Sequence, residues 1–255
     1  MIGFESKWLN NYIAKSKIQT QMKQKHIYLL RSIIFIGFGL SILCTSAQDK
    51  PSFVGLRTGV SIPFSKYAAK DLDEGSFTQA GFNVAIDGAW FFKPKFGVGG
   101  AVGLNLLPVD VASLGRARVD KDPFLSSVVI RSEPWKIIIA MIGPYFQFPI
   151  SSKFSFSAKL LGGLLYGKTP YQLYKPDYYL LPDDWAEITP ATDMKFSWQT
   201  GIGIVYNLNT CIDLALDADL FYDKLAFGFN SSTGYYTDER TIAMINTTLG
   251  LRINL

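Results

Sequence analysis

Four aspartates, Asp213, Asp217, Asp219 and Asp223, recur at spacings of two and four residues. Clustered carboxylates are typical of a metal site or an ion path, and Asp217 and Asp219 also resemble the acid and base of a catalytic pair. Residues two or four apart lie on one face of a β-strand. The spacing therefore predicts a strand with an acidic face, and the chemistry of that face depends on what surrounds it.

A second group of candidate residues is aromatic and comprises Tyr171, Tyr174, Tyr178, Tyr179 and Trp185, interspersed with charged residues. Exposed aromatic clusters stack on sugars or anchor a protein partner. They also cap the rim of a barrel or lie in the headgroup region of a membrane, and we favour this rim interpretation. The five residues are retained as candidate contacts for a ligand.

The sequence has one histidine, His26, and two cysteines, Cys44 and Cys211. If residues 1–47 are removed on export, one cysteine and no histidine remain. An intramolecular disulfide, a Ser-His or Cys-His nucleophile pair and histidine-ligated zinc are then excluded. We therefore expect no enzyme, no metal and no cofactor.

Residues 1–47 have the features of an export signal. Basic residues precede an apolar core from Ser32 to Leu43, and the small residues Thr45, Ser46 and Ala47 follow it. We expect cleavage after Ala47 and a mature chain that starts at Gln48. Lipidation at Cys44 is the less favoured alternative, because the preceding Leu43 is bulky. The predicted organisation is an N-terminal extension with a signal peptide over 1–47 and one domain over 48–255.

The charge balance argues against nucleic acid as a partner. The net charge of the 255-residue chain is +4, but residues 1–47 hold six of its 25 Lys and Arg and one of its 21 acids. The remainder has a net charge of −1, so a phosphate-binding surface loses its support. Charged residues make up 18% of the chain, against roughly 25% in ordinary soluble domains.

From Ser52 onward, apolar residues alternate with small or polar ones, which is the period of β-strands with two different environments. We find no sustained helical periodicity. Eight strands are predicted, over Phe53–Phe64, Ala80–Phe92, Phe96–Leu106, Lys136–Ile150, Phe154–Tyr166, Phe196–Asn207, Ile212–Asp223 and Thr241–Leu255. The alternation is weakest in the fourth strand, because large side chains occupy both of its faces. Its Pro144 is compatible with a β-bulge.

The connections between these strands alternate in length. Three are short, at Lys93–Lys95, Ser151–Lys153 and Asn207–Cys211, and four are long, at Ser65–Gln79, Leu107–Trp135, Gly167–Lys195 and Asp223–Arg240. Short turns in the periplasm and long loops outside are typical of outer-membrane barrels. The prediction is an all-β fold, an eight-stranded antiparallel up-and-down transmembrane β-barrel.

In such a barrel the charged alternate positions face the lumen. The predicted lumen network comprises Arg57, Asp87, Lys159, Asp213, Asp217, Asp219 and Arg252, with Asp223 on the same face. An eight-stranded barrel has an interior only wide enough for side chains to fill it. We therefore favour a packed network of ion pairs over an ion path, a metal site or a catalytic pair.

Three stretches resemble the small porin-like outer-membrane β-barrel proteins of Bacteroidetes: Thr45–Gln48 at the cleavage point, Val54–Val60 in the first strand and Leu249–Leu255 in the last. The resemblance covers residues 48–255 and implies outer-membrane lipid and the barrel-assembly machinery as partners. The family's last strand usually ends in an aromatic residue, and Leu255 departs from that pattern.

The leading functional hypothesis is a non-enzymatic outer-membrane barrel that is structural, adhesive or ligand-binding through its extracellular loops. A barrel component of a protein secretion apparatus, similar in size to subunits of the Bacteroidetes type IX system, is an alternative. A membrane-embedded enzyme is another, although several barrel enzyme families use a histidine base that the mature chain lacks. An open porin is disfavoured because eight strands leave little lumen.

Overall fold

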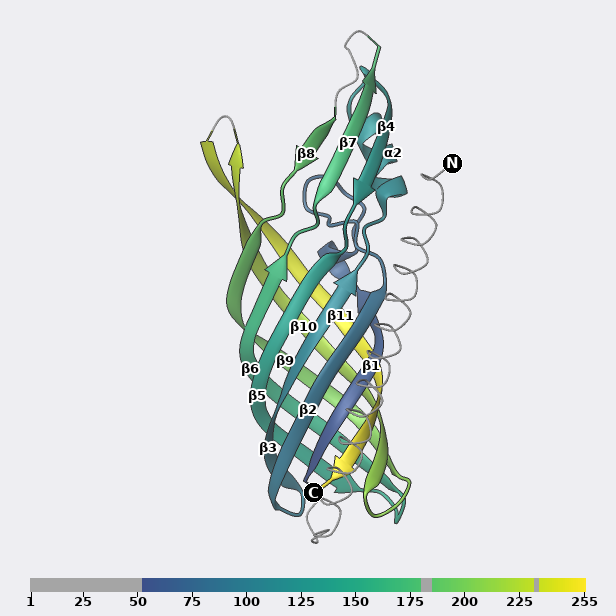
Figure 1. Cartoon of the computed structure of the whole chain (residues 1–255), viewed down its shortest axis with the longest axis vertical. Coiled ribbons are helices and arrows are strands. Elements are labelled where there is room, and N and C mark those ends of the chain that lie inside the picture. The colour runs from purple at the N-terminus through teal and green to yellow at the C-terminus, as the bar shows by residue number, and fades with distance from the viewer. Residues whose placement is uncertain (1–51, 180–184, 232–233) are drawn as a thin grey trace, which may run out of the picture. The chain divides into compact units, whose positions relative to one another are not determined.

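The computed structural model describes residues 52–179, 185–231 and 234–255 (Figure 1). The chain divides into two units, Met1–Ser46 and Ala47–Leu255, and all the described residues lie in the second. The predicted signal peptide and its cleavage site lie outside the described residues.

Eight antiparallel strands close into a barrel in which each strand pairs with its neighbours along the chain and the first pairs with the last. The barrel strands are β1 (Phe53–Pro63), β2 (Gly81–Lys93), β3 (Phe96–Leu107), β5 (Trp135–Pro149), β6 (Phe154–Lys168), β9 (Thr192–Asn207), β10 (Ile212–Ser231) and β11 (Gly234–Asn254). The predicted eight-stranded up-and-down barrel is confirmed.

The two faces of the strands differ as the period of two predicts. On β10, Leu216 is 51% exposed, whereas its neighbours Ala215 and Asp217 are 0% and 1% exposed. Large apolar side chains cover the outer face on every barrel strand, for example Ile86, Val102 and Trp198. A closed barrel satisfies all its backbone hydrogen bonds between strands, so this apolar exterior is the surface of a membrane-spanning barrel.

The lumen contains an apolar layer that the sequence interpretation did not anticipate. Toward the loop end, the inward positions are filled by fully buried side chains of Ile137, Ile139, Leu161, Leu165, Phe221, Leu225, Phe227, Ile242 and Met244. This layer explains the bulk on both faces of the fourth predicted strand: one face meets lipid and the other meets this inner core.

The bulge suggested near Pro144 is wrong. The pairing of β5 with β6 is interrupted at Gly143 and Pro144, but the register is the same on both sides of the gap. Proline lacks the N–H that the ladder would use, so pairing is interrupted here without an extra residue. Within the described barrel strands, a register shift lies between β2 and β3, at Phe91 and Lys93.

The three short turns are found where predicted, but the long loops are largely structured (Figure 1). A 3-10 turn, η2 (Ser65–Tyr67), follows β1. Helix α2 (Val111–Lys121) and β4 (Leu125–Ser132) lie between β3 and β5, while β7 (Gln172–Tyr178) and β8 (Ala186–Ile188) lie between β6 and β9. Helix α2 is an element that the search for sustained helical periodicity did not predict. None of the described helices is long and apolar enough to cross a membrane.

Two further features replace the predicted irregular loops. Strands β4, β7 and β8 form a separate three-stranded antiparallel sheet. The predicted loop Asp223–Arg240 is instead a continuation of β10 and β11, which stay paired up to Ser231 and Gly234. We call the described residues within 65–80, 108–134, 169–191 and 223–240 the head.

Candidate functional site

Six of the predicted network residues meet in the lumen as a charge-balanced cluster of three cations and three carboxylates. Arg57 contacts Asp219 at 2.7 Å and Asp87 at 3.5 Å. Lys159 contacts Asp219 at 2.8 Å and Asp217 at 3.7 Å. Every charge in the cluster therefore has at least one opposite charge within 4 Å.

Arg252 completes this cluster. Its Nη2 lies 3.0 Å from Asp217 Oδ2 and 3.8 Å from Asp87 Oδ2, and its guanidinium lies 4.2 Å from the ring centre of Phe53. All six charged side chains are at most 3% exposed. Buried charges at this depth persist when they are paired.

Glycine makes these contacts possible. Gly201 on β9 lies between Lys159 on β6 and Asp219 on β10, directly opposite both. A Cβ atom at Gly201 would collide with the Asp219 carboxylate and the Lys159 side chain. The two charged residues therefore reach each other across β9 because that strand has no side chain at this level.

Two predicted lumen aspartates lie apart from the cluster. Asp213 is buried and opposite Arg252 in the strand register, but no described cation lies within 4 Å of its carboxylate. Asp223 lies four residues further along β10 than Asp219, toward the loop end, where Lys195 contacts it at 3.2 Å. Its carboxylate is therefore paired outside the cluster.

The carboxylates of the lumen cluster are buried and paired. Asp217 and Asp219 are 1% and 2% exposed, and both are held by cations. Among the residues that the structure describes, no group of three or more His, Cys, Asp or Glu side chains is placed to hold a metal ion.

The five aromatic candidates do not gather into one patch. Tyr174 on β7 is buried, Tyr178 is partly buried, and Tyr179 is 72% exposed. Tyr171 donates a hydrogen bond of 2.8 Å to Glu187, which raises the pKa of the tyrosine hydroxyl. Trp185 is 47% exposed and has the Arg131 guanidinium 5.7 Å from its ring centre. Tyr174 and Tyr178 lie on β7 of the three-stranded sheet, which the rim interpretation did not foresee, while Tyr171, Tyr179 and Trp185 flank its strands.

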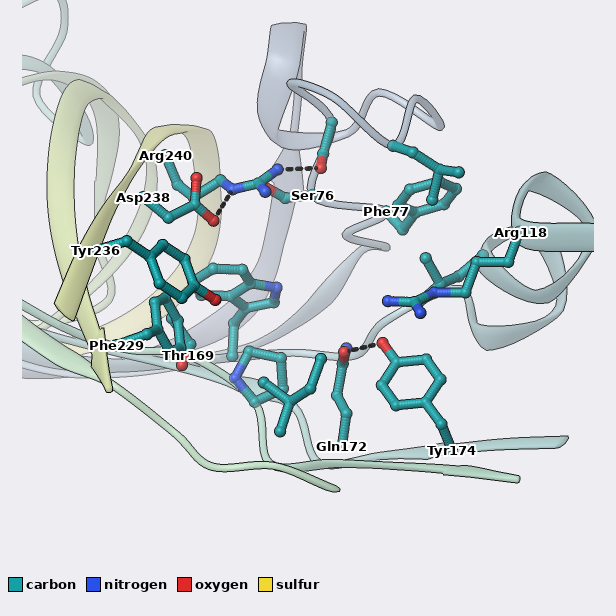
Figure 2. Close-up of a pocket in the computed structure, with 16 residues that line it drawn as sticks. Ser76, Phe77, Arg118, Thr169, Gln172, Tyr174, Phe229, Tyr236, Asp238 and Arg240 are labelled. Carbon is teal, nitrogen blue, oxygen red and sulfur yellow. Dashed lines mark hydrogen bonds and ion pairs between the residues drawn. The ribbon is translucent and has the colours of Figure 1, made fainter. Parts of the chain in front are cut away.

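The head contains a cavity of about 230 Å³ (Figure 2). Its walls come from the segment before β2, from α2, from the start of β5, from β7 and β8, and from β10 and β11. Apolar and aromatic side chains make much of the wall, including Phe77, Trp135, Tyr174, Phe229 and Tyr236. Trp135 also packs on the apolar layer of the lumen, with its ring centre 5.7 Å from that of Phe227.

Two arginines reach this cavity and differ in their partners. Arg240 donates to Asp238 at 2.7 Å and to the carbonyl oxygen of Gly75 at 2.6 Å. Figure 2 shows the Arg118 guanidinium pointing into the cavity beside Tyr174, 4.0 Å from the ring centre. No described carboxylate lies within 4 Å of Arg118, so its charge is not neutralised by the residues that the structure describes.

Helix α2 holds Arg118 in place and is anchored at its start by Asp110. This carboxylate accepts 3.0 Å and 2.7 Å hydrogen bonds from the backbone N–H and hydroxyl of Ser113, and Lys70 contacts it at 2.7 Å. The Lys70 ammonium and the Ser113 donors lower the pKa of Asp110 well below its usual value of 3.8. An aspartate at this position satisfies a helix N–H that would otherwise lack a partner.

Sequence reasoning missed Arg118, Trp135, Tyr236 and Arg240 as site residues. Their order in the sequence carries no signal, because the cavity forms only where separate connections pack together above the barrel. Tyr174 is the one aromatic candidate that lines it.

These features define an eight-stranded transmembrane β-barrel with a filled lumen and a folded head at its loop end. No protein-family model matches the chain, and no curated protein matches its sequence. Among solved structures, it is similar to Ail, the attachment invasion locus protein of Yersinia pestis, at 16% identity and a TM-score of 0.42, over 80% of this chain and 97% of that one. Neisserial surface protein A is similar at 9% identity and a TM-score of 0.42, over 81% and 98%. The outer membrane protein OprG from Pseudomonas aeruginosa is similar at 10% identity and a TM-score of 0.36, over 82% and 96%.

Proposed function

We propose that this protein is a non-enzymatic β-barrel of the bacterial outer membrane that binds a ligand through its head. The barrel anchors the head, the short turns face the periplasm and the head faces the outside of the cell. The observation that carries this proposal is the placement of an aromatic-walled cavity at the loop end, above a lumen filled by side chains.

The filled lumen supports binding rather than transport. A solute path would have to pass the ion-pair cluster and the apolar layer, where Arg57, Asp217 and Leu161 are at most 1% exposed. Opening such a path means separating buried charges or removing well-packed apolar contacts, and both are costly. The head is then the part of the molecule that contacts solutes.

Three parts of the proposal rest on the sequence alone. The chain is exported by a signal peptide that is removed after Ala47, it is inserted by the barrel-assembly machinery, and it belongs to the porin-like barrels of Bacteroidetes. Its resemblance at Val54–Val60 and Leu249–Leu255 supports the last two parts.

Thiol labelling of intact cells tests the orientation. Cys211 lies in the turn between β9 and β10, and Ser127 on β4 is exposed in the head. A maleimide attached to a polymer too large to cross the outer membrane should label a Ser127→Cys, Cys211→Ser variant on intact cells. It should label Cys211 of the parent protein only after the outer membrane is permeabilised. The opposite pattern would reverse the orientation and contradict the proposal.

Planar-bilayer recording tests the sealed lumen. Purified protein, shown to be folded by its altered migration in a detergent gel before boiling, should give no steady porin-sized conductance. A stable conductance of that size would contradict the sealed lumen and indicate transport in place of binding.

A further inference from the structure

We propose that the head cavity binds a single-ring sugar acid, such as a hexuronic acid, through Arg118. This inference rests on the proposed function, since it assigns the ligand class of the same head. It follows from the charge, the unpaired polar atoms and the size of the cavity.

The charge of the cavity favours an anion. Of the charged side chains that line it, Asp238 and Arg240 neutralise each other at 2.7 Å, and Arg118 contributes the remaining positive charge. The guanidinium of arginine matches a carboxylate with two parallel donors, and such charge-assisted hydrogen bonds are stronger than neutral ones. The Tyr174 ring, with its centre 4.0 Å from the Arg118 guanidinium carbon, helps to hold this guanidinium in position before a ligand arrives.

Unpaired polar atoms in the wall call for further oxygen atoms on the ligand. Arg118 Nε, Trp135 Nε1 and Ser76 Oγ have no hydrogen-bond partner among the described residues. Trp135 is 5% exposed and Ser76 is 8% exposed. Buried polar groups are normally hydrogen-bonded, so these three atoms beside one cavity are candidate donors to a ligand with several acceptors. The hydroxyl and ring oxygens of a sugar provide them.

The wall and the volume of the cavity favour a ligand with a single ring. The aromatic side chains of Trp135, Phe229 and Tyr236 line the wall, and aromatic rings are surfaces on which the C–H groups of a sugar ring pack. A cavity of about 230 Å³ lies below the roughly 300–1,000 Å³ of sites for drug-sized ligands. One sugar unit, free or at the end of a chain, fits this limit better than an internal stretch of polysaccharide.

Titration of the full-length folded protein in detergent, followed by calorimetry or ligand-observed NMR, tests the proposal. The probes are glucuronate, its neutral counterpart glucose, and benzoate, a ring carboxylate without hydroxyls. We expect glucuronate to bind at least about tenfold more tightly than either of the others, the ratio expected for one charge-assisted hydrogen bond.

Variants assign the effect to the cavity. Arg118→Gln should weaken glucuronate binding about tenfold, while Arg116→Gln, an exposed arginine on the same helix, should leave it unchanged. Trp135→Phe keeps an aromatic ring but removes the indole N–H. It should weaken glucuronate binding by a smaller factor than Arg118→Gln does. Migration before and after boiling checks that each variant is folded.

The outcomes separate this inference from the proposed function. Equal binding of glucose and glucuronate, stronger binding of benzoate, an unaffected Arg118→Gln variant, or no binding of any probe would each overturn the sugar-acid assignment. None of these results would contradict the proposed location of the head at the cell surface or the closed lumen. A labelling pattern that places the head in the periplasm would instead overturn the proposed function.

Discussion

Arg57 on β1 and Asp219 on β10 form a 2.7 Å ion pair although 162 residues separate them in the sequence. The intervening strand, β11, has Gly250 directly opposite Arg57, and Ala215 lies opposite Gly250 on β10. The Arg57 side chain packs over Gly250, with Cγ 2.8 Å from where a Cβ of Gly250 would lie. Small residues opposite long charged ones thus leave space inside the lumen for the ion pairs.

Removing one carboxylate from the lumen cluster should destabilise the barrel. We expect Asp217→Ala to cost about 1–3 kcal/mol, since Arg252 and Lys159 lose a partner at 3.0 Å and 3.7 Å but each retains another. The double variant Asp217→Ala, Lys159→Met restores charge balance and should recover part of that loss. Urea titrations in lipid vesicles measure both, and an unchanged single variant would mean that water replaces the carboxylate.

A charge on the outer face should be more damaging than a small polar change on the inner one. Leu216→Arg places a cation on the lipid-facing side of β10 and should cost about 2–4 kcal/mol near the bilayer midplane. Ala215→Ser, on the lumen side of the same strand, should cost far less. Refolding titrations compare the two variants, and equal costs would reject the assigned orientation of β10.

The apolar layer of the lumen should behave as a protein core. Leu161 is fully buried, so Leu161→Ala should cost about 2–5 kcal/mol in unfolding free energy. Leu161→Met preserves the volume and should cost less than about 1.5 kcal/mol. A small effect of the alanine variant would show that this level of the lumen is hydrated.

Helix α2 should lose protection in acid. Because the folded-state pKa of Asp110 is lowered, its carboxylate stabilises the helix fully above its usual pKa of 3.8, and this contribution falls as pH drops further toward the lowered folded-state value. Asp110→Ala should remove about 1 kcal/mol at neutral pH, as expected for a lost helix cap. Amide hydrogen exchange of α2 between about pH 2 and pH 6 measures this change, and Asp120→Ala on the exposed side is the control. Equal acid sensitivity of parent and Asp110→Ala would contradict the assignment.

The barrel could be predicted from the sequence because lipid and lumen impose opposite demands on alternate residues. On β10, the alternation from Ile212 to Asp223 reveals both faces, and the turn at Ser151–Lys153 marks an end. The charged lumen residues follow from the same alternation. Their pairing does not, because it depends on which strands carry a glycine at the level of Lys159 and Asp219.

The head could not be predicted, because its residues lack a repeating environment. Leu225 and Phe227 continue the inward face of β10, although the sequence analysis predicts a long connection over Asp223–Arg240. Helix α2 is short, and only Leu114 and Gly115 in it are buried, which leaves little helical periodicity to detect. Trp135 and Arg118 come together through packing between segments, and local sequence does not encode that contact.

The pairing of β1 with β11 has a consequence for how the molecule assembles. β1 is the first barrel strand in the sequence and β11 is the last, so their pairing has the largest sequence separation in the fold. It therefore has the largest entropic cost of loop closure. The cluster draws Arg57 from β1 and Arg252 from β11, so neither guanidinium has its full set of counter-charges until that seam is shut. An open sheet would carry these charges and its unpaired edges into hydrocarbon, which the bilayer penalises heavily. Seam closure and entry into the membrane are therefore coupled steps, and both need β1 and β11 to be paired.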